Sequence, residues 1–150
     1  MAEPTASIIA QLPYADVSAA LLWLERAFGF REVAGARFVG AGGLIHAEVI
    51  TERGGHIMLG SPGGHGVYPP AASGRPSILL CVYVEDAKAH CARARAAGGQ
   101  IVAEPEDKFF GDRVYECVDL EGHRWSFHQQ LRASGASPRA ASHGRAESTR

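Results

Sequence analysis

The chain has 150 residues, of which 46% are hydrophobic and 21% charged, and its formal net charge is −1. That length can bury a core without disulfides or a structural metal, and the composition is that of an ordinary globular protein. The small net charge gives no electrostatic attraction to DNA, RNA or an anionic membrane, so we predict no nucleic-acid and no membrane partner.

The N-terminal segment and the cysteines point to the cytoplasm. MAEPTASIIA lacks the basic start and long apolar run of a signal peptide, and no stretch reaches the roughly 20 apolar residues of a membrane span. Cys81, Cys91 and Cys117 are too few and too scattered for a disulfide framework or a zinc knuckle. We therefore expect a cytoplasmic protein with reduced thiols.

The first half of the chain predicts a strand, a helix and several short strands. SIIAQLPY is a plausible strand, and the helix after it begins at the N-cap Asp16 and stops at Gly29. The short apolar segments FREVAG, ARFVG, LIHAEVI and HIMLG follow, separated by turns. The Gly/Pro-rich residues 61–76 are typical of a connector.

The second half repeats this plan. SILLCVYV predicts a strand, a helix begins at Asp86 and stops at Gly98–Gly99, and QIVAEP, RVYECVDL and RWSFHQQ predict three more strands. Asp16 and Asp86 are 70 residues apart, and so are Gly29 and Gly99. His90 lies on the second helix and is expected to be solvated.

The hairpins that end the two halves also correspond. HAEVITERGGHIML aligns with VYECVDLEGHRWSF, which places Glu48 on Glu116 and Met58 on Ser126 at an offset of 68 residues. A small deletion between helix and hairpin accounts for the difference from 70. The chain therefore contains an internal duplication.

This duplication predicts an α+β fold of two tandem βαβββ modules. The modules span about residues 7–60 and 77–131, are joined by the connector 61–76, and together form a single domain over residues 1–132. The tail, residues 133–150, is rich in Ser, Ala, Gly and Arg without apolar periodicity, and we predict that it is disordered.

Several stretches resemble the vicinal oxygen chelate superfamily, which includes glyoxalase I, extradiol dioxygenases and bleomycin-resistance proteins. They are YADVSAALLWLERAFGF in the first module and VYVEDAKAHCARARAAGGQIVAEPEDKFFGDRVYECVDLEGHRWSF in the second. The ending GDRVY…D-x-EGHRW-F resembles the bleomycin-resistance-like branch. The resemblance covers about residues 7–131 and implies curved mixed sheets around a cavity, helices on the convex side and a homodimer.

In metal-dependent members of this superfamily, His and Glu ligands come from the first and last strands of each module. The resemblance places these positions at Ile9, Leu79, Met58 and Ser126, and the repeat offsets pair the same residues. Aliphatic side chains offer no ligand, and a thioether or a hydroxyl is a poor donor for Zn²⁺, Fe²⁺ or Mn²⁺. We therefore predict no metal and no cofactor.

Further residues should line the cavity because side chains alternate across a strand. Those two positions from the four just named are Gln11, His56, Cys81, Arg124 and His128. If the two hairpins close with odd-length loops, Glu48 and Glu116 lie across from Met58 and Ser126, and His46 shares the face of Glu48.

Three roles remain open for His46, Glu48 and His56. They could be a polar pocket wall whose groups bond each other or a ligand, or they could form a relocated metal site. Alternatively, Glu48 or Glu116 could serve as a general base with a pKa raised by burial, with His46 as a further catalytic candidate. That last role would make the protein an isomerase, lyase or cyclase.

The segment FFGDRVY contributes the remaining ligand-binding candidates. Arg113 could bind an anionic group through its guanidinium fork, or it could pair with Asp112 or Glu116. Phe109 and Phe110 could stack on a flat ligand, with core packing as the alternative.

The expected function is metal-free binding of a small molecule, such as an antibiotic or a planar aromatic metabolite, by a homodimer of the bleomycin-resistance type. The alternative is an enzyme of the glyoxalase superfamily that uses a relocated metal or metal-free acid–base catalysis. A partner-binding dimer without a small-molecule ligand is the third possibility.

Overall fold

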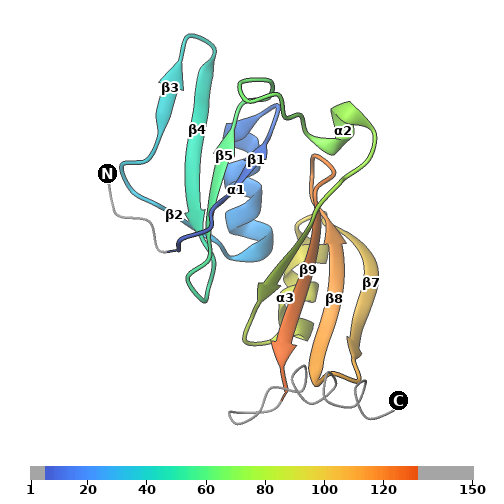
Figure 1. The fold of residues 1–150 in the computed structure, drawn as a ribbon. Coiled ribbons are helices and arrows are strands. Elements are labelled where there is room, and N and C mark those ends of the chain that lie inside the picture. Colours follow the sequence, from blue (N-terminus) through green and yellow to red (C-terminus); the bar gives the residue numbers. More distant parts are fainter. Residues whose placement is uncertain (1–5, 132–150) are drawn as a thin grey trace, which may run out of the picture.

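The computed structural model describes residues 6–131, which build two sheets with helices behind them (Figure 1). The first module holds β1 (Ala10–Pro13), α1 (Val17–Phe28), β2 (Arg31–Glu32), β3 (Phe38–Gly40), β4 (Gly43–Ile50) and β5 (His56–Gly60). The short helix α2 (Pro70–Ser73) follows, and the second module holds β6 (Leu79–Tyr83), α3 (Ala87–Ala96), β7 (Gln100–Asp107), β8 (Asp112–Val118) and β9 (Arg124–Gln130). The predicted disordered tail lies outside the described residues.

Both sheets are mixed and share one strand order. The first runs β1-β5-β4-β2, with β3 also paired to β4, and the second runs β6-β9-β8-β7. In each sheet the first strand is parallel to the last, and the other pairs are antiparallel. The predicted α+β class is confirmed. The two sheets differ at one edge. In the first sheet the two short strands β2 and β3 both pair with β4, whereas in the second sheet the single strand β7 pairs with β8.

The helix caps explain why the sequence repeat is so regular. Asp16 accepts a hydrogen bond from the backbone N–H of Ala19 (2.9 Å), and Asp86 accepts one from Ala89 (3.0 Å). Each bond satisfies a donor that the first helical turn leaves unpaired. Gly29 ends α1 with φ 71°, a left-handed conformation that glycine adopts without steric cost.

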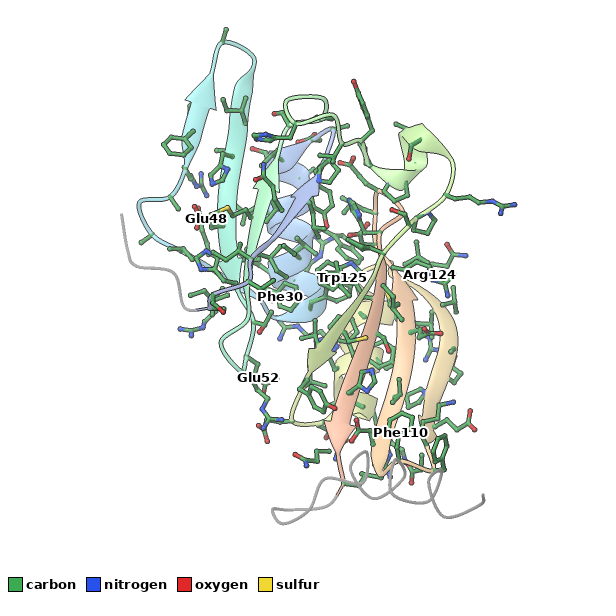
Figure 2. The ribbon with its side chains drawn as sticks, in the orientation of Figure 1. Phe30, Glu48, Glu52, Phe110, Arg124 and Trp125 are labelled. Atoms are coloured by element: carbon green, nitrogen blue, oxygen red, sulfur yellow. The ribbon has the colours of Figure 1, made fainter. Side chains whose placement is uncertain are left out.

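The two modules share one apolar core. In both sheets, every second side chain along a strand points toward the helices α1 and α3. The two helices also contact each other. Phe28 at the end of α1 lies 4.7 Å from Phe127 and 5.3 Å from Trp125 between ring centroids. Figure 2 shows Phe30 and Trp125 meeting in the same region, with centroids 5.5 Å apart. The first module's helix therefore packs on the second module's last strand.

The connector is held against the second module. The backbone N–H of Ala71 in α2 donates to the carbonyl of Glu121 in the β8–β9 turn (3.0 Å). Gly122 in that turn has φ 95°, and a Cβ there would lie 3.1 Å from Pro70 Cβ. A side chain at position 122 would strain the backbone and crowd α2. Within residues 6–131, no helix has the length and apolar character needed to cross a membrane.

His90 is not solvated, contrary to the expectation from its place on a helix. Its Nε2 donates to the carbonyl of Phe28 (2.9 Å), its Nδ1 accepts from the hydroxyl of Tyr115, and its ring lies 4.2 Å from that of Phe127. The side of α3 that carries His90 faces α1 and the sheet. Burial lowers the pKa of His90 to about 4; the hydrogen bond to Phe28 opposes this shift, and Arg93 adds to it.

This pKa predicts acid sensitivity. His90 is neutral in the fold and has an ordinary pKa of 6.5 when unfolded, so the unfolded chain binds more protons between pH 6.5 and pH 4. The free energy of unfolding should fall by about 3 kcal/mol across that window because of this group. Urea unfolding of the wild type and His90→Gln at pH 7 and pH 4.5 checks it. The variant should lose less stability on acidification, and equal losses would contradict the assignment.

Candidate functional site

A row of three side chains crosses the helix-free face of the first sheet. Met58 on β5 is paired with Gln11 on β1 and with Glu48 on β4. Paired residues on neighbouring strands point to the same face of a sheet. The predicted pairing of Glu48 with Met58 is therefore confirmed, and the face opposite α1 carries these residues, as Figure 2 shows for Glu48.

Glu48 is the centre of a hydrogen-bond network on this face. Its Oε2 lies 2.9 Å from His46 Nε2, and its Oε1 lies 2.5 Å from His56 Nε2. Glu48 and His56 are each only 5% exposed. The three side chains are therefore hydrogen-bonded to one another across β4 and β5.

The electrostatics of Glu48 do not match a general base with a raised pKa. Burial raises the pKa of this carboxyl, but hydrogen bonds from His46 and His56 outweigh burial, and the net pKa is lowered. A carboxylate that is already stabilised as an anion is a weaker proton acceptor. The alternative of a raised pKa does not hold at Glu48, because the sequence could not place both imidazoles on the same carboxylate.

The residues at the family's four ligand positions do not fit a metal. Ile9 lies just before β1, Leu79 opens β6, and Met58 and Ser126 offer a thioether and a hydroxyl. None of them is a good donor for a divalent metal. Within residues 6–131, no three His, Cys, Asp or Glu side chains are grouped so as to hold a metal ion.

The second sheet repeats the row with different chemistry. Ser126 on β9 is paired with Cys81 on β6 and with Glu116 on β8. Arg124 lies two residues before Ser126 on the same face (Figure 2). Its Nη2 is 3.9 Å from Glu116 Oε2. The predicted alignment of Glu116 with Ser126 is confirmed, and the face combines an exposed thiol, a hydroxyl and a loose ion pair.

A polar chain continues along β9 beyond Ser126. Ser126 Oγ lies 2.9 Å from His128 Nε2, and His128 Nδ1 lies 3.3 Å from Asp112 Oδ2. The hydroxyl of Tyr83 donates to the same Asp112 oxygen (2.8 Å). Asp112 and Tyr83 were not among the predicted site residues. The alternation of side chains along a strand could have identified Asp112, because it lies four residues before Glu116 on β8 and so points to the same face.

The FFGDRVY segment is divided between the two sides of the sheet. Arg113 shares the parity of the buried Tyr115 and binds Asp107 through Nε (2.6 Å) and Nη2 (3.2 Å). It therefore pairs with neither of the predicted carboxylates and lies on the face opposite Ser126. Phe110 lies 6.3 Å from His128 between ring centroids, on the site face, whereas Phe109 is 90% exposed.

Two cavities lie along the junction between β1 and β6. One, about 330 Å³, is lined by Gln11 and by connector residues that include Tyr68 and Arg75. The other, about 410 Å³, is lined by residues of both sheets, among them His56 and Cys81. Three of the predicted ligand-binding residues thus border hollows of the size that small ligands occupy.

Comparison with known proteins agrees with this architecture. The sequence profile of the Glyoxalase/Bleomycin resistance protein/Dioxygenase superfamily matches residues 7–127. An uncharacterized protein of Mycobacterium bovis is 32% identical over 123 residues, which cover 78% of each chain.

Solved structures that share the fold include those of TioX and TnmS3. The crystal structure of TioX from Micromonospora sp. ML1 has 34% identity, covers 84% of this chain and 99% of its own, and has a TM-score of 0.68. TnmS3, an antibiotic binding protein from Streptomyces sp. CB03234, has 19% identity, covers 81% of this chain and 93% of its own, and has a TM-score of 0.63. On its sequence and its fold, the chain belongs to the Glyoxalase/Bleomycin resistance protein/Dioxygenase superfamily.

Proposed function

We propose that the protein binds a small molecule on the helix-free faces of its sheets without the help of a metal. The observation that carries this proposal is the Glu48 network beside Met58. Its polar groups bond one another at fixed positions, while the family's metal-ligand positions hold residues that are poor donors for a divalent metal. Mostly apolar walls with a few oriented polar groups are typical of ligand-binding pockets.

The chemistry of the face favours a planar, largely apolar ligand. Phe38 is half-exposed, lies 5.1 Å from the ring of His46 between centroids, and offers a surface for stacking. The ionised Glu48 would accept a hydrogen bond from a ligand donor that displaces one imidazole. TnmS3 shares the fold and is named an antibiotic binding protein, which supports including antibiotics among the ligands tested.

We further propose a cytoplasmic homodimer. The site face of each sheet leaves large apolar side chains exposed in the single chain, including Phe38 (51%) and Leu79 (48%). Exposed apolar surface of this kind is typical of an interaction site. Two copies that bring such faces together would convert each open sheet into a crevice. The three cysteines are free thiols, in keeping with a reducing compartment.

Glu48→Gln tests the binding site. A planar aromatic antibiotic found by thermal-shift screening should bind the variant at least about tenfold more weakly by calorimetric titration, because an amide cannot accept from both imidazoles. Glu116→Gln, the same change on the second sheet, removes only a loose ion pair at 3.9 Å and should change this affinity less.

Two further measurements on the same protein and ligand distinguish binding from catalysis and test for a metal. The ligand should be recovered chemically unchanged after long incubation, and elemental analysis of the purified protein should find no stoichiometric metal. Turnover of the ligand that Glu48→Gln abolishes would establish an enzyme instead. Tightly held metal that disappears in His46→Ala would overturn the metal-free site.

A further inference from the structure

The second sheet carries a hydroxyl, an imidazole and a carboxylate joined in one line. Ser126 Oγ meets His128 Nε2 at 2.9 Å, and His128 Nδ1 meets Asp112 Oδ2 at 3.3 Å. The three side chains are 3% to 5% exposed. The order of atoms is the one by which an imidazole activates a serine, with the carboxylate fixing the ring's tautomer and orientation.

We propose that Ser126 is a nucleophile that takes the acyl group of a small ester and passes it to water, with His128 as its base. Ser126 and His128 would be catalytic residues because they touch the reacting atoms, whereas Asp112 is a positioning residue that acts through His128. This activity goes beyond ligand binding and does not rest on it.

The surroundings of the imidazole hold it in place. Asp112 also accepts a hydrogen bond from Tyr83 (2.8 Å), which fixes the carboxylate against β6. Phe110 lies beside His128, with a ring-centroid distance of 6.3 Å and an interplanar angle of 32°. With its carboxylate and its ring both packed, His128 is oriented before any substrate arrives, which is the condition for efficient proton transfer.

A cation lies on the other side of the nucleophile. Arg124, Ser126 and His128 alternate along β9, so their side chains share one face, spaced about 7 Å apart at each step. The Arg124 guanidinium is half-exposed and only loosely paired, at 3.9 Å from Glu116. A carbonyl placed over Ser126 thus has the base toward one end of the strand and a cation toward the other, where it can stabilise an oxyanion.

The reaction balances with an ester and water alone. Ser126 Oγ forms a bond to the carbonyl carbon while its proton moves to His128 Nε2, and collapse of the tetrahedral intermediate breaks the C–O bond to the leaving group, which takes that proton. A water molecule then attacks the acyl-serine, giving one proton to His128. Cleavage of the acyl bond releases the carboxylic acid and returns that proton to Ser126.

The first sheet provides an internal contrast. It has imidazoles on a carboxylate, but Met58 stands where the second sheet has Ser126. A thioether has no proton to give up and forms no stable acyl intermediate. Acylation should therefore be confined to the second sheet.

The test uses p-nitrophenyl acetate and the full-length chain. The wild type should release a burst of p-nitrophenolate, and peptide mass mapping should place one acetyl group on Ser126. Ser126→Ala should abolish the burst, and His128→Gln should slow it about a hundredfold or more. Ser18→Ala removes an exposed serine of α1 and should leave the burst unchanged.

Two more variants separate chemistry from folding. Asp112→Asn should lower the rate constant of the burst while the burst amplitude, which counts the folded sites, is retained; loss of structure alone would lower the amplitude instead. Ser126→Cys keeps a nucleophile beside the same imidazole and should again be acetylated at position 126, and circular dichroism reports the folded state of each variant. A burst that survives in Ser126→Ala, or acetyl found on Cys81 with Ser126 unmodified, would overturn the proposal. The antibiotic titrations probe Glu48 on the first sheet and the burst probes Ser126 on the second, so either proposal can fail alone.

Discussion

Replacing Phe28 by alanine should lower the free energy of unfolding by about 4 kcal/mol, because this ring joins the two modules. Phe28 is 3% exposed and contacts aromatic rings from both halves: Trp23 at 5.0 Å on its own helix, and Trp125 and Phe127 at 5.3 and 4.7 Å on β9. The cavity left by truncation would be walled by elements of both sheets, which cannot collapse onto it without moving the modules. Urea unfolding followed by circular dichroism measures the change.

Leu22 provides the matched control on the same helix. It is 64% exposed, so Leu22→Ala should change the free energy of unfolding by no more than about 0.5 kcal/mol. Phe28→Leu keeps most of the apolar volume and should cost about half as much as the alanine substitution. If Phe28→Ala cost less than about 1 kcal/mol, the two modules would not share a tightly packed core.

Asp119→Ala should be similarly costly, at about 4 kcal/mol, because one carboxylate satisfies four donors. Its Oδ2 accepts from the Tyr14 hydroxyl (2.7 Å) and the Trp125 indole N–H (3.0 Å), and its Oδ1 accepts from the backbone N–H groups of Glu121 and His123 (3.0 Å each). Burial and the neighbouring carboxylate raise the pKa of Tyr14 well above its ordinary value, so its hydroxyl remains a donor. Thermal and urea unfolding would both report the loss.

The equivalent turn of the first module supplies the control. Thr51, 68 residues before Asp119, accepts a single backbone N–H from Gly55 (2.8 Å), so Thr51→Ala should cost only about 1 kcal/mol. A double-mutant cycle of Asp119→Ala with Tyr14→Phe should give a coupling energy of about 1 kcal/mol or more. Equal costs at positions 119 and 51 would show that the three additional donors on Asp119, among them the Tyr14 hydroxyl of the first module, contribute nothing.

Sequence reasoning succeeded where structure is determined locally. The caps at Asp16 and Asp86 and the left-handed Gly29 are set by a few neighbouring residues, and they mark the repeat directly. The pairing of Glu48 with Met58 depended on the assumption of an odd-length hairpin loop, which the structure bears out. These features predicted the fold class, both modules and one face of each sheet.

It failed where the answer depends on contacts between the modules. His90 is buried because α3 lies against α1, and its hydrogen-bond partner Phe28 is 62 residues away. Arg113 was a different failure, since alternation with Tyr115 already assigned it to the helix-facing side, and its charge alone made it a ligand candidate. The chain of Ser126, His128 and Asp112 needed side-chain geometry that no spacing supplies.

The contact that Phe28 makes with the second module shows that the two halves of the chain are not interchangeable. The position equivalent to Phe28, 70 residues later in the chain, is Gly98. The second module therefore has no aromatic ring there to make the same contact with the first module. Two identical copies of the first module could not reproduce this joint, and neither could two copies of the second. The halves have become complementary parts that cannot be exchanged. The site faces of the two sheets differ as well: the first has imidazoles on a carboxylate, whereas the second has a serine bonded to an imidazole.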